Sequence, residues 1–102
     1  MKIIKPATVR AWAHRFPNAA PSLLGWLALI KAARFTDFVA LRQVYRSADW
    51  VRVDSGRNVV VFNISGNNYR LIAAVHFNTQ RVFALRFMTH AEYSKNKWKE
   101  NL

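Results

Sequence analysis

The stretch NVVVFNISGNNYRLIAAVHFNTQRVFALRFM, residues 58–88, decides the fold of this 102-residue chain. It contains three apolar runs that are separated by two short turn signals, SGNN at residues 65–68 and NTQ at residues 78–80. Glycine and asparagine tolerate the positive φ angles that tight hairpin turns require. The pattern therefore predicts three consecutive antiparallel strands, Asn58–Ile64, Tyr69–Phe77 and Arg81–Met88.

One more strand is expected just before this stretch, at residues 50–54 (WVRVD), where apolar and polar residues alternate. Further upstream, apolar residues recur at the spacing of amphipathic helices. We expect three helices there: one from Pro6 to Phe16, one from about residue 19 to Ile30, and one from Thr36, as its N-cap, to Tyr45. The predicted fold class is α+β, with N-terminal helices packed on an antiparallel sheet of about four strands, in a single domain spanning residues 1–102.

The charge of the chain is strongly one-sided. Sixteen Lys and Arg stand against five Asp and Glu, which gives a formal net charge of +11. The basic residues are spread along the whole chain, so they form a field over the fold and not a charged tail. Because most basic groups lack an acidic partner within the chain, an anionic partner is expected: nucleic acid, an anionic membrane or an acidic protein.

Several functional classes are excluded or disfavoured by composition. Cysteine is absent and the three histidines are scattered, so neither a disulfide nor a structural zinc site is expected. The most apolar stretch, LLGWLALI at residues 23–30, is too short to span a bilayer, and no signal peptide is visible. We therefore expect a cytoplasmic protein with no metal, no cofactor and no membrane partner.

Reactive side chains concentrate in FMTHAEYSKNKW, residues 87–98, directly after the last predicted strand. RNA can be cleaved without a metal if one group accepts the proton of the ribose 2′-OH, another stabilises the phosphoryl charge and a third assists the leaving oxygen. His90 and Tyr93 can exchange protons, and Lys95 and Lys97 supply positive charge. The Tyr93 ring can also stack on a base.

Arg70 is an isolated cation in the apolar strand that follows the SGNN turn. Burying such a charge alone is costly, so it needs an edge, a carboxylate or an anionic ligand. If the NTQ turn pairs Phe77 with Val82, Arg70 lies opposite Thr89 and beside His90, whereas Arg86 lies on the other sheet face. A register shifted by one residue would place both arginines on one face. Arg70 is therefore the stronger candidate of the two.

Each of these residues also has an interpretation without chemistry. His90 at a strand end can serve as a surface or capping residue, and Tyr93 can pack its ring on the sheet edge. Lys95 and Lys97 can belong to a solvated tail that is anchored by Trp98. His76 and His14, the other two histidines, are weaker candidates and are assigned to a strand and to a solvated helix face.

Three segments together resemble the HigB-type toxins of bacterial toxin–antitoxin pairs, within the RelE-like superfamily. They are VVFNISGNNYRLIAAVHF (60–77), RVFALRFMTHAEYSK (81–95) and DFVALRQVYRSADWV (37–51). The resemblance implies a compact α+β fold whose concave sheet face holds an RNA site. It also implies an endoribonuclease that cleaves mRNA on translating ribosomes, and a cognate antitoxin, usually a small helix-turn-helix protein.

By position, the resemblance implies catalytic roles for Arg70, His90 and Tyr93. Because members of the superfamily differ in their catalytic residues, either His90 or Tyr93 is the general base. The predicted RNA-binding residues are Arg86, Lys95, Lys97, Asn67 and Arg57, with a plain turn role as the alternative for Asn67. The alternative function is a non-catalytic RNA-binding or ribosome-binding module.

Overall fold

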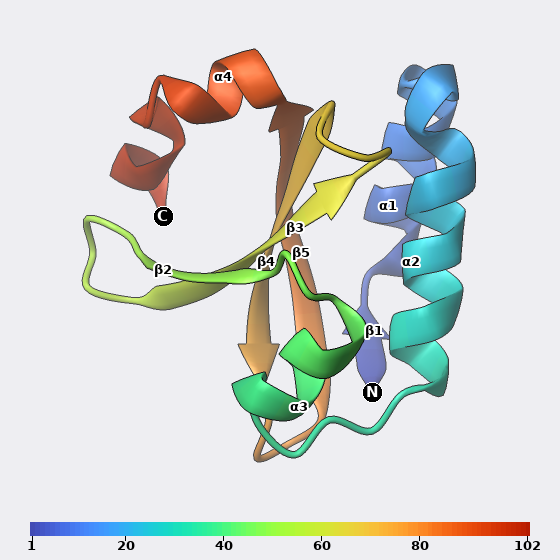
Figure 1. Cartoon of the computed structure of the whole chain (residues 1–102), viewed down its shortest axis with the longest axis vertical. Helices are drawn as coiled ribbons and strands as arrows, with labels where there is room; N and C mark the ends of the chain where they lie inside the picture. Colours follow the sequence, from blue (N-terminus) through green and yellow to red (C-terminus); the bar gives the residue numbers. More distant parts are fainter.

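A computed structural model describes all residues 1–102 as helices packed on a five-stranded sheet (Figure 1). The strands are β1 (Lys2–Ile4), β2 (Asp49–Arg52), β3 (Asn58–Ile64), β4 (Tyr69–His76) and β5 (Arg81–Thr89). The helices are α1 (Pro6–Arg15), α2 (Ala20–Ala32), α3 (Phe38–Val44) and α4 (His90–Ser94), with 3-10 turns at Pro17–Ala19 and Lys97–Asn101. The α+β class is confirmed, but the sheet has one strand more than predicted. None of the helices is both long and apolar enough to cross a bilayer.

The additional strand makes the sheet mixed. Strands β2 to β5 form the expected antiparallel meander. Across the whole sheet the strand order is β1-β5-β4-β3-β2. At the edge, β1 pairs with β5 in parallel, and the Lys2 backbone N–H donates to the Gln80 carbonyl at 2.7 Å. This strand is only three residues long. A period of two cannot be recognised in so short a segment, so β1 was not predicted.

Helices α1 and α2 cover one face of the sheet (Figure 1). Helix α2 contributes the fully buried Leu23, Trp26 and Ile30, which belong to the same apolar core as Phe62 of β3. The rings of Trp26 and Phe62 meet edge to face, with centroids 5.4 Å apart. Burial of such large side chains contributes about 1.5–3 kcal/mol each, so this face supplies most of the stability.

The third helix begins differently from the prediction. Its N-cap is Asp37, not Thr36: the Asp37 carboxylate accepts a hydrogen bond from the Ala40 backbone N–H at 2.8 Å. Asp and Thr are both favourable capping residues. Because the first helical residue is Phe38, the N-cap is the residue directly before it, Asp37. The consequence for the fold is small, since α3 still presents Leu41 to the core.

The opposite sheet face is covered only in part, by the C-terminal segment (Figure 1). Here a smaller apolar cluster consists of Val53, Val59, Val61, Ile72 and Trp98. Trp98 lies in the 3-10 turn after α4 and is 6% exposed. Trp98 thus anchors the C-terminal tail, as in the interpretation that assigns Lys95 and Lys97 to a solvated tail. The remainder of this face stays open, and we call it the open face.

The pairing of β4 with β5 corrects the predicted register. Val82 pairs with Val75, not with Phe77, because residues 77–80 all belong to the turn. A bulge between Ile72 and Ala73 then shifts the pairing by one, so that Arg70 faces Met88 and Ile72 faces Arg86. Because pairing partners share a face, Arg70 and Arg86 both project onto the open face. The prediction that they lie on opposite faces is wrong.

Candidate functional site

The candidate site lies where β4 begins, β5 ends and α4 starts. The SGNN turn that leads into β4 has positive φ angles at Ser65 (55°) and Gly66 (67°). The glycine behaves as predicted, but the second positive φ belongs to Ser65 and not to an asparagine. Thr89 caps α4 by accepting a hydrogen bond from the Glu92 backbone N–H at 3.2 Å. The His90 backbone N–H donates to the Asn68 carbonyl at 2.9 Å. These contacts fix the start of α4 against the turn.

Arg70 is buried at this end of the sheet, with only 7% of its surface exposed. Its Nη1 donates to the carbonyl oxygens of Asn67 at 3.1 Å and Tyr69 at 3.0 Å, and its Nη2 donates to the Asn67 side-chain oxygen. No carboxylate pairs with it, since the one ion pair of the chain joins Lys95 to Glu92 at 3.3 Å. The guanidinium is therefore held by dipoles, and its charge is not neutralised.

Tyr93 links Arg70 to the C-terminal anchor. The Arg70 Cζ lies 5.5 Å from the centre of the Tyr93 ring, within cation–π range. The Tyr93 ring also stacks on Trp98, with centroids 5.2 Å apart and an interplanar angle of 17°. The Trp98 Nε1–H donates to the Tyr93 carbonyl at 3.1 Å. Two contacts thus occupy the ring and fix its orientation, which leaves less of it free to stack on a base.

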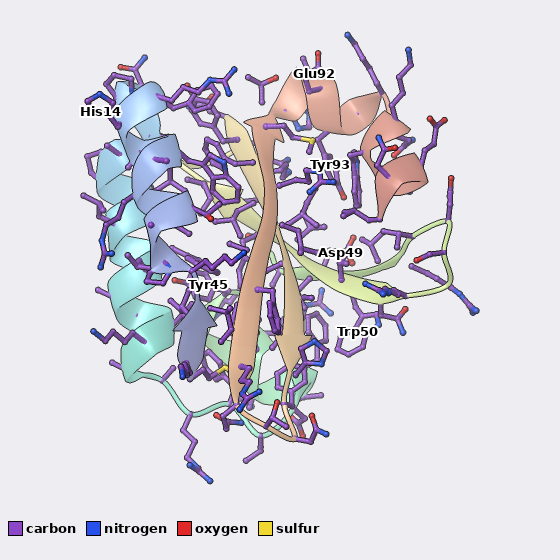
Figure 2. The ribbon with its side chains drawn as sticks, turned by 180° about the vertical axis from the view of Figure 1, so that it is seen from behind. His14, Tyr45, Asp49, Trp50, Glu92 and Tyr93 are labelled. Carbon is purple, nitrogen blue, oxygen red and sulfur yellow. The ribbon has the colours of Figure 1, made fainter.

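The surroundings of Tyr93 keep its phenol protonated. Burial raises the pKa of Tyr93 above its usual value of 10.0, the Asp49 carboxylate raises it further, and Arg70 lowers it. The net direction is upward, so at neutral pH the group is a proton donor. Figure 2 shows Asp49 and Tyr93 on the same side of the sheet, away from α1 and α2.

Asp49 is the residue that sequence reasoning missed. Nothing in its sequence context predicts a role, because Tyr93 lies far along the chain. The pairing of Asp49 with Val61 at the start of β2 brings it onto the open face. No local pattern carries that information, since it depends on how β2 and β3 pair and on where α4 folds back.

The other predicted residues are spread over the open face and its border. His90 is exposed at the start of α4, and its ring makes no hydrogen bond within the chain. Arg86 is exposed and donates from Nη1 to the Leu85 carbonyl at 2.8 Å. Lys95 is paired with Glu92, and Lys97 is exposed in the last turn.

Asn67 and Arg57, two of the predicted RNA-binding residues, lie at opposite ends of the open face. The Asn67 side chain holds Arg70, so it is more than a turn residue. Arg57 lies at the other end of the open face, beside a separate hollow. The structure thus brings together Arg70, Tyr93, Asn67 and the start of α4, and leaves Arg57 apart from them.

These groups match the chemical needs of phosphodiester cleavage. Arg70 supplies a positive charge fixed in place, Tyr93 a protonated phenol and His90 a free imidazole. Preorganised charge of this kind stabilises a developing phosphorane without reorganisation. Nowhere in the chain do three His, Asp or Glu side chains gather in a way that could hold a metal ion.

Comparison with known proteins agrees with the motifs. A family model described as HigB_toxin, RelE-like toxic component of a toxin-antitoxin system, matches residues 19–96. The chain is 32% identical over 96 residues to mRNA interferase HigB of Escherichia coli O6:H1 (strain CFT073), with 93% of this chain and 90% of that protein covered. It is 28% identical over 93 residues to mRNA interferase toxin HigB of Escherichia coli K12, with 91% and 88% covered.

The family match includes the start of α4 and both residues of the Arg70–Tyr93 contact. It begins at residue 19, so it covers α2, α3 and strands β2 to β5 as well as the candidate site, but not β1 or α1. The relatives match over nearly their full lengths, which excludes a shared fragment as the cause of the similarity. The chain belongs to the HigB_toxin family of RelE-like toxins of toxin–antitoxin systems.

Proposed function

We propose that this chain is an endoribonuclease that inhibits translation by cleaving mRNA on the ribosome, through attack of the ribose 2′-OH and without a metal ion. Two observations support the proposal: the relatives are named mRNA interferases, and the Arg70 guanidinium lies against the Tyr93 ring on the open face. The observation that carries it is the guanidinium of Arg70, whose charge has no acidic partner and which lies against Tyr93.

In the proposed reaction the 2′-oxygen forms a bond to phosphorus while the bond from phosphorus to the 5′-oxygen breaks. One group accepts the 2′-OH proton and another donates a proton to the 5′-oxygen. Because its raised pKa keeps the Tyr93 phenol protonated at neutral pH, we assign the donor role to Tyr93 and the acceptor role to His90. The two residues are three positions apart on α4, a spacing that places side chains on one side of a helix.

Arg70 retains donors for a phosphate. A guanidinium has five N–H groups, and the bonds to Asn67 and Tyr69 use Nη1 and one hydrogen of Nη2. The Nε–H and the second Nη2–H remain. Two adjacent donors of this kind match two oxygens of a phosphate. We therefore propose that Arg70 binds the scissile phosphate through them.

The test is to incubate the purified protein with ribosomes that carry a defined mRNA and to analyse the ends of the products. The expected ends are a 2′,3′-cyclic phosphate and a free 5′-OH, with no effect of EDTA beyond its effect on the ribosome. Naked RNA of the same sequence should remain intact. Products with a 5′-phosphate and a free 3′-OH would overturn the proposed mechanism.

A non-catalytic RNA-binding or ribosome-binding module is the second candidate, because Arg70 is almost fully buried and has partners within the chain. His90→Ala and Tyr93→Phe, singly and together, separate the two. A catalyst should lose cleavage and growth inhibition while it keeps ribosome binding. Full toxicity of the double variant would favour inhibition by occupancy.

The family also implies a partner. We propose that a cognate antitoxin, a small helix-turn-helix protein, binds this chain. We also propose that residues 1–102 form a single domain and that the protein acts in the cytoplasm. Co-expression of this chain with the product of the neighbouring gene, followed by purification, tests the partner. A stable complex that no longer inhibits growth is the expected result.

A further inference from the structure

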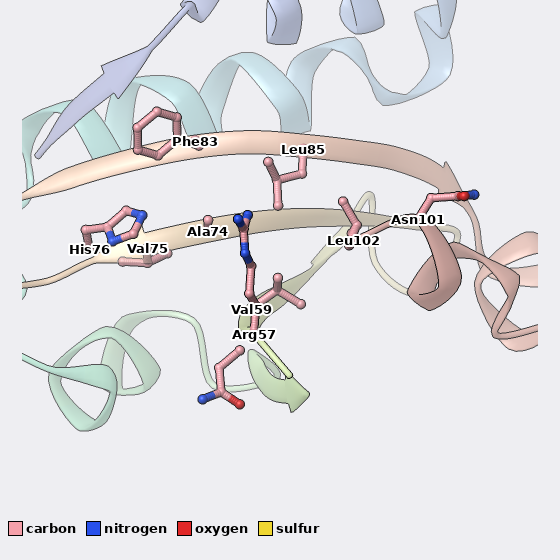
Figure 3. A pocket seen from close by; sticks show the side chains of 10 residues that line it. Arg57, Val59, Ala74, Val75, His76, Phe83, Leu85, Asn101 and Leu102 are labelled. Carbon is pink, nitrogen blue, oxygen red and sulfur yellow. The ribbon is translucent and has the colours of Figure 1, made fainter. Parts of the chain in front are cut away.

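A second feature of the open face is a hollow of about 760 Å³ (Figure 3). Its apolar lining includes Val59 of β3, Ala74 of β4, and Phe83 and Leu85 of β5. Arg57 and His76 are the titratable side chains at its border. The hollow lies on the same face as Arg70, because Ala74 and Arg70 are separated by four positions of β4.

The local geometry of the hollow follows from the sheet. Ala74 pairs with Phe83, and the small alanine leaves room beside the ring. The His76 ring meets Phe83 edge to face, with centroids 5.4 Å apart and an interplanar angle of 87°. His76 is exposed, so its imidazole stands at the opening of the hollow. The C-terminal segment lies beside it and is tied down by the Ser55 Oγ–H, which donates to the Leu102 carbonyl at 2.7 Å.

The chemistry of this lining fits a nucleobase. No Asp or Glu side chain lines the hollow, and Arg57 adds a positive charge at its border, opposite in sign to the terminal carboxylate of Leu102, which also lines it. Single-stranded RNA is recognised by splayed bases that stack on aromatic rings, with Arg and His contacting base edges or phosphates. An apolar ligand would not need the exposed His76 and Arg57, and a cationic ligand would meet a protein of charge +11.

We propose that this hollow binds one base of the RNA, next to Phe83, with His76 at the base edge and Arg57 at a phosphate. The proposal rests on the proposed function, since it places one RNA substrate across the Arg70–Tyr93 contact and the hollow. Four strand residues span about 13 Å, so the base belongs to a nucleotide that flanks the cleaved bond. Phe83 and His76 then determine sequence preference and leave the chemical step to Arg70, Tyr93 and His90.

The principal experiment compares the base preference of cleavage in variants of the hollow. His76→Ala changes an exposed side chain, so it leaves the fold intact, whereas Phe83→Ala removes the stacking surface. The matched control is His14→Ala, which changes an exposed histidine on α1, far from the open face (Figure 2). Cut sites are mapped on ribosomes that carry mRNA randomised around the cleavage position.

We expect Phe83→Ala to slow cleavage at preferred sequences by roughly 5- to 150-fold, the effect of losing one base stack. Preference should flatten at one position relative to the cut in both Phe83→Ala and His76→Ala. His14→Ala should keep the wild-type pattern. Unchanged base preference in both hollow variants would overturn the proposal.

A second measurement does not depend on cleavage. The ¹⁵N-labelled full chain is titrated with short single-stranded oligoribonucleotides of uniform base composition, and backbone amide shifts are followed by NMR. Shifts at Ala74, His76 and Phe83 that disappear in Phe83→Ala support the base site, even if the wild-type protein cleaves nothing and the proposed function fails. Absence of these shifts with all four bases, or shifts only with an acidic peptide, would overturn it.

Discussion

The two faces of the sheet use the same strands for opposite purposes. Toward α1 and α2, β3 and β4 present Phe62 and Leu71, which are fully buried among large apolar side chains. Toward the open face, the neighbouring positions of the same strands are Asn63 and Arg70, a cross-strand pair near the end of the sheet where α4 begins. The period of two thus separates a face that stabilises the fold from a face that carries charge.

The contrast shows how a small domain can hold a buried cation. Arg70 lacks a carboxylate, yet the turn beside it supplies carbonyl and amide oxygens, and Tyr93 supplies a ring. The apolar face offsets the cost of this arrangement, because its packing does not depend on the open face. Variants on the helix-covered face should therefore change stability, and variants on the open face should change activity.

The largest effect is expected for Phe62→Ala. This side chain is fully buried and contacts both Trp26 and Tyr45 edge to face, with centroids 5.4 and 5.1 Å apart. Loss of a buried Phe leaves a cavity and costs about 3–5 kcal/mol. Chemical denaturation of the isolated protein measures the loss. Val39→Ala, at a position that is 68% exposed, is the control and should change the free energy of unfolding by less than about 0.5 kcal/mol.

Arg70→Ala breaks the open face in a different way. If its guanidinium binds the scissile phosphate, cleavage should slow by roughly 30- to 1,000-fold, which corresponds to about 2–4 kcal/mol of transition-state stabilisation. Arg70→Lys should recover only part of the rate, since it retains the charge but not the paired donors. Single-turnover cleavage on programmed ribosomes measures both variants.

Asn67→Ala is the companion variant, because it removes an oxygen that holds Arg70 without removing the cation. It should lower the rate less than Arg70→Ala does. Thermal melts of both variants show how much of each effect is structural. A sharply lower melting temperature for Arg70→Ala, with normal cleavage by the protein that remains folded, would make Arg70 a structural residue.

Tyr45 offers a test of the covered face at alkaline pH. Burial raises the pKa of Tyr45 from 10.0 to about 12. The unfolded chain therefore loses this proton first, so stability from this group is complete below about pH 10 and is lost as the pH rises toward 12. The loss is less than about 2 kcal/mol, because the side chain is only half-buried.

The measurement is the free energy of unfolding of wild type and Tyr45→Phe at about pH 9 and about pH 11. The wild-type protein should lose more stability between the two values than Tyr45→Phe does. Other groups titrate in this range in both proteins, so only the difference between them reports on Tyr45. Equal losses would show that the Tyr45 hydroxyl is already solvated in the folded state.

The sequence could predict the elements but not all of their contacts. The apolar runs and the turn glycine of SGNN were sufficient for β3, β4 and β5, because each carries its own local signal. The register was not predictable, since the bulge near Ile72 and the four-residue turn before Arg81 have no distinctive residues. That bulge is what places Arg86 on the same face as Arg70.

The candidate site was predictable only where its members are close in sequence or one strand apart. The predicted hairpin register, which placed Arg70 opposite Thr89 and beside His90, is wrong by one residue at Arg70. Arg70 still lies at the start of α4, where its guanidinium contacts the Tyr93 ring. Asp49 and Trp98 entered the site through strand pairing and tail packing. Neither contact has a local sequence signal. The catalytic roles themselves stay predictions.

The smallest expected effect is that of Asp49→Asn, which sharpens the comparison by changing charge on the open face alone. The Asp49 carboxylate raises the pKa of Tyr93, so its removal should lower that pKa toward the usual value. Cleavage near neutral pH should change little, less than about threefold, because the phenol remains protonated in both proteins. The alkaline limb of the rate profile should shift to lower pH.

Titration of the Tyr93 ring by ¹³C NMR reports the pKa directly, and Asp54→Asn, which changes an exposed carboxylate in the turn after β2, is the matched control. A lower Tyr93 pKa together with an unshifted alkaline limb would show that the Tyr93 proton takes no part in the rate-limiting step, and the donor role would then pass to another group.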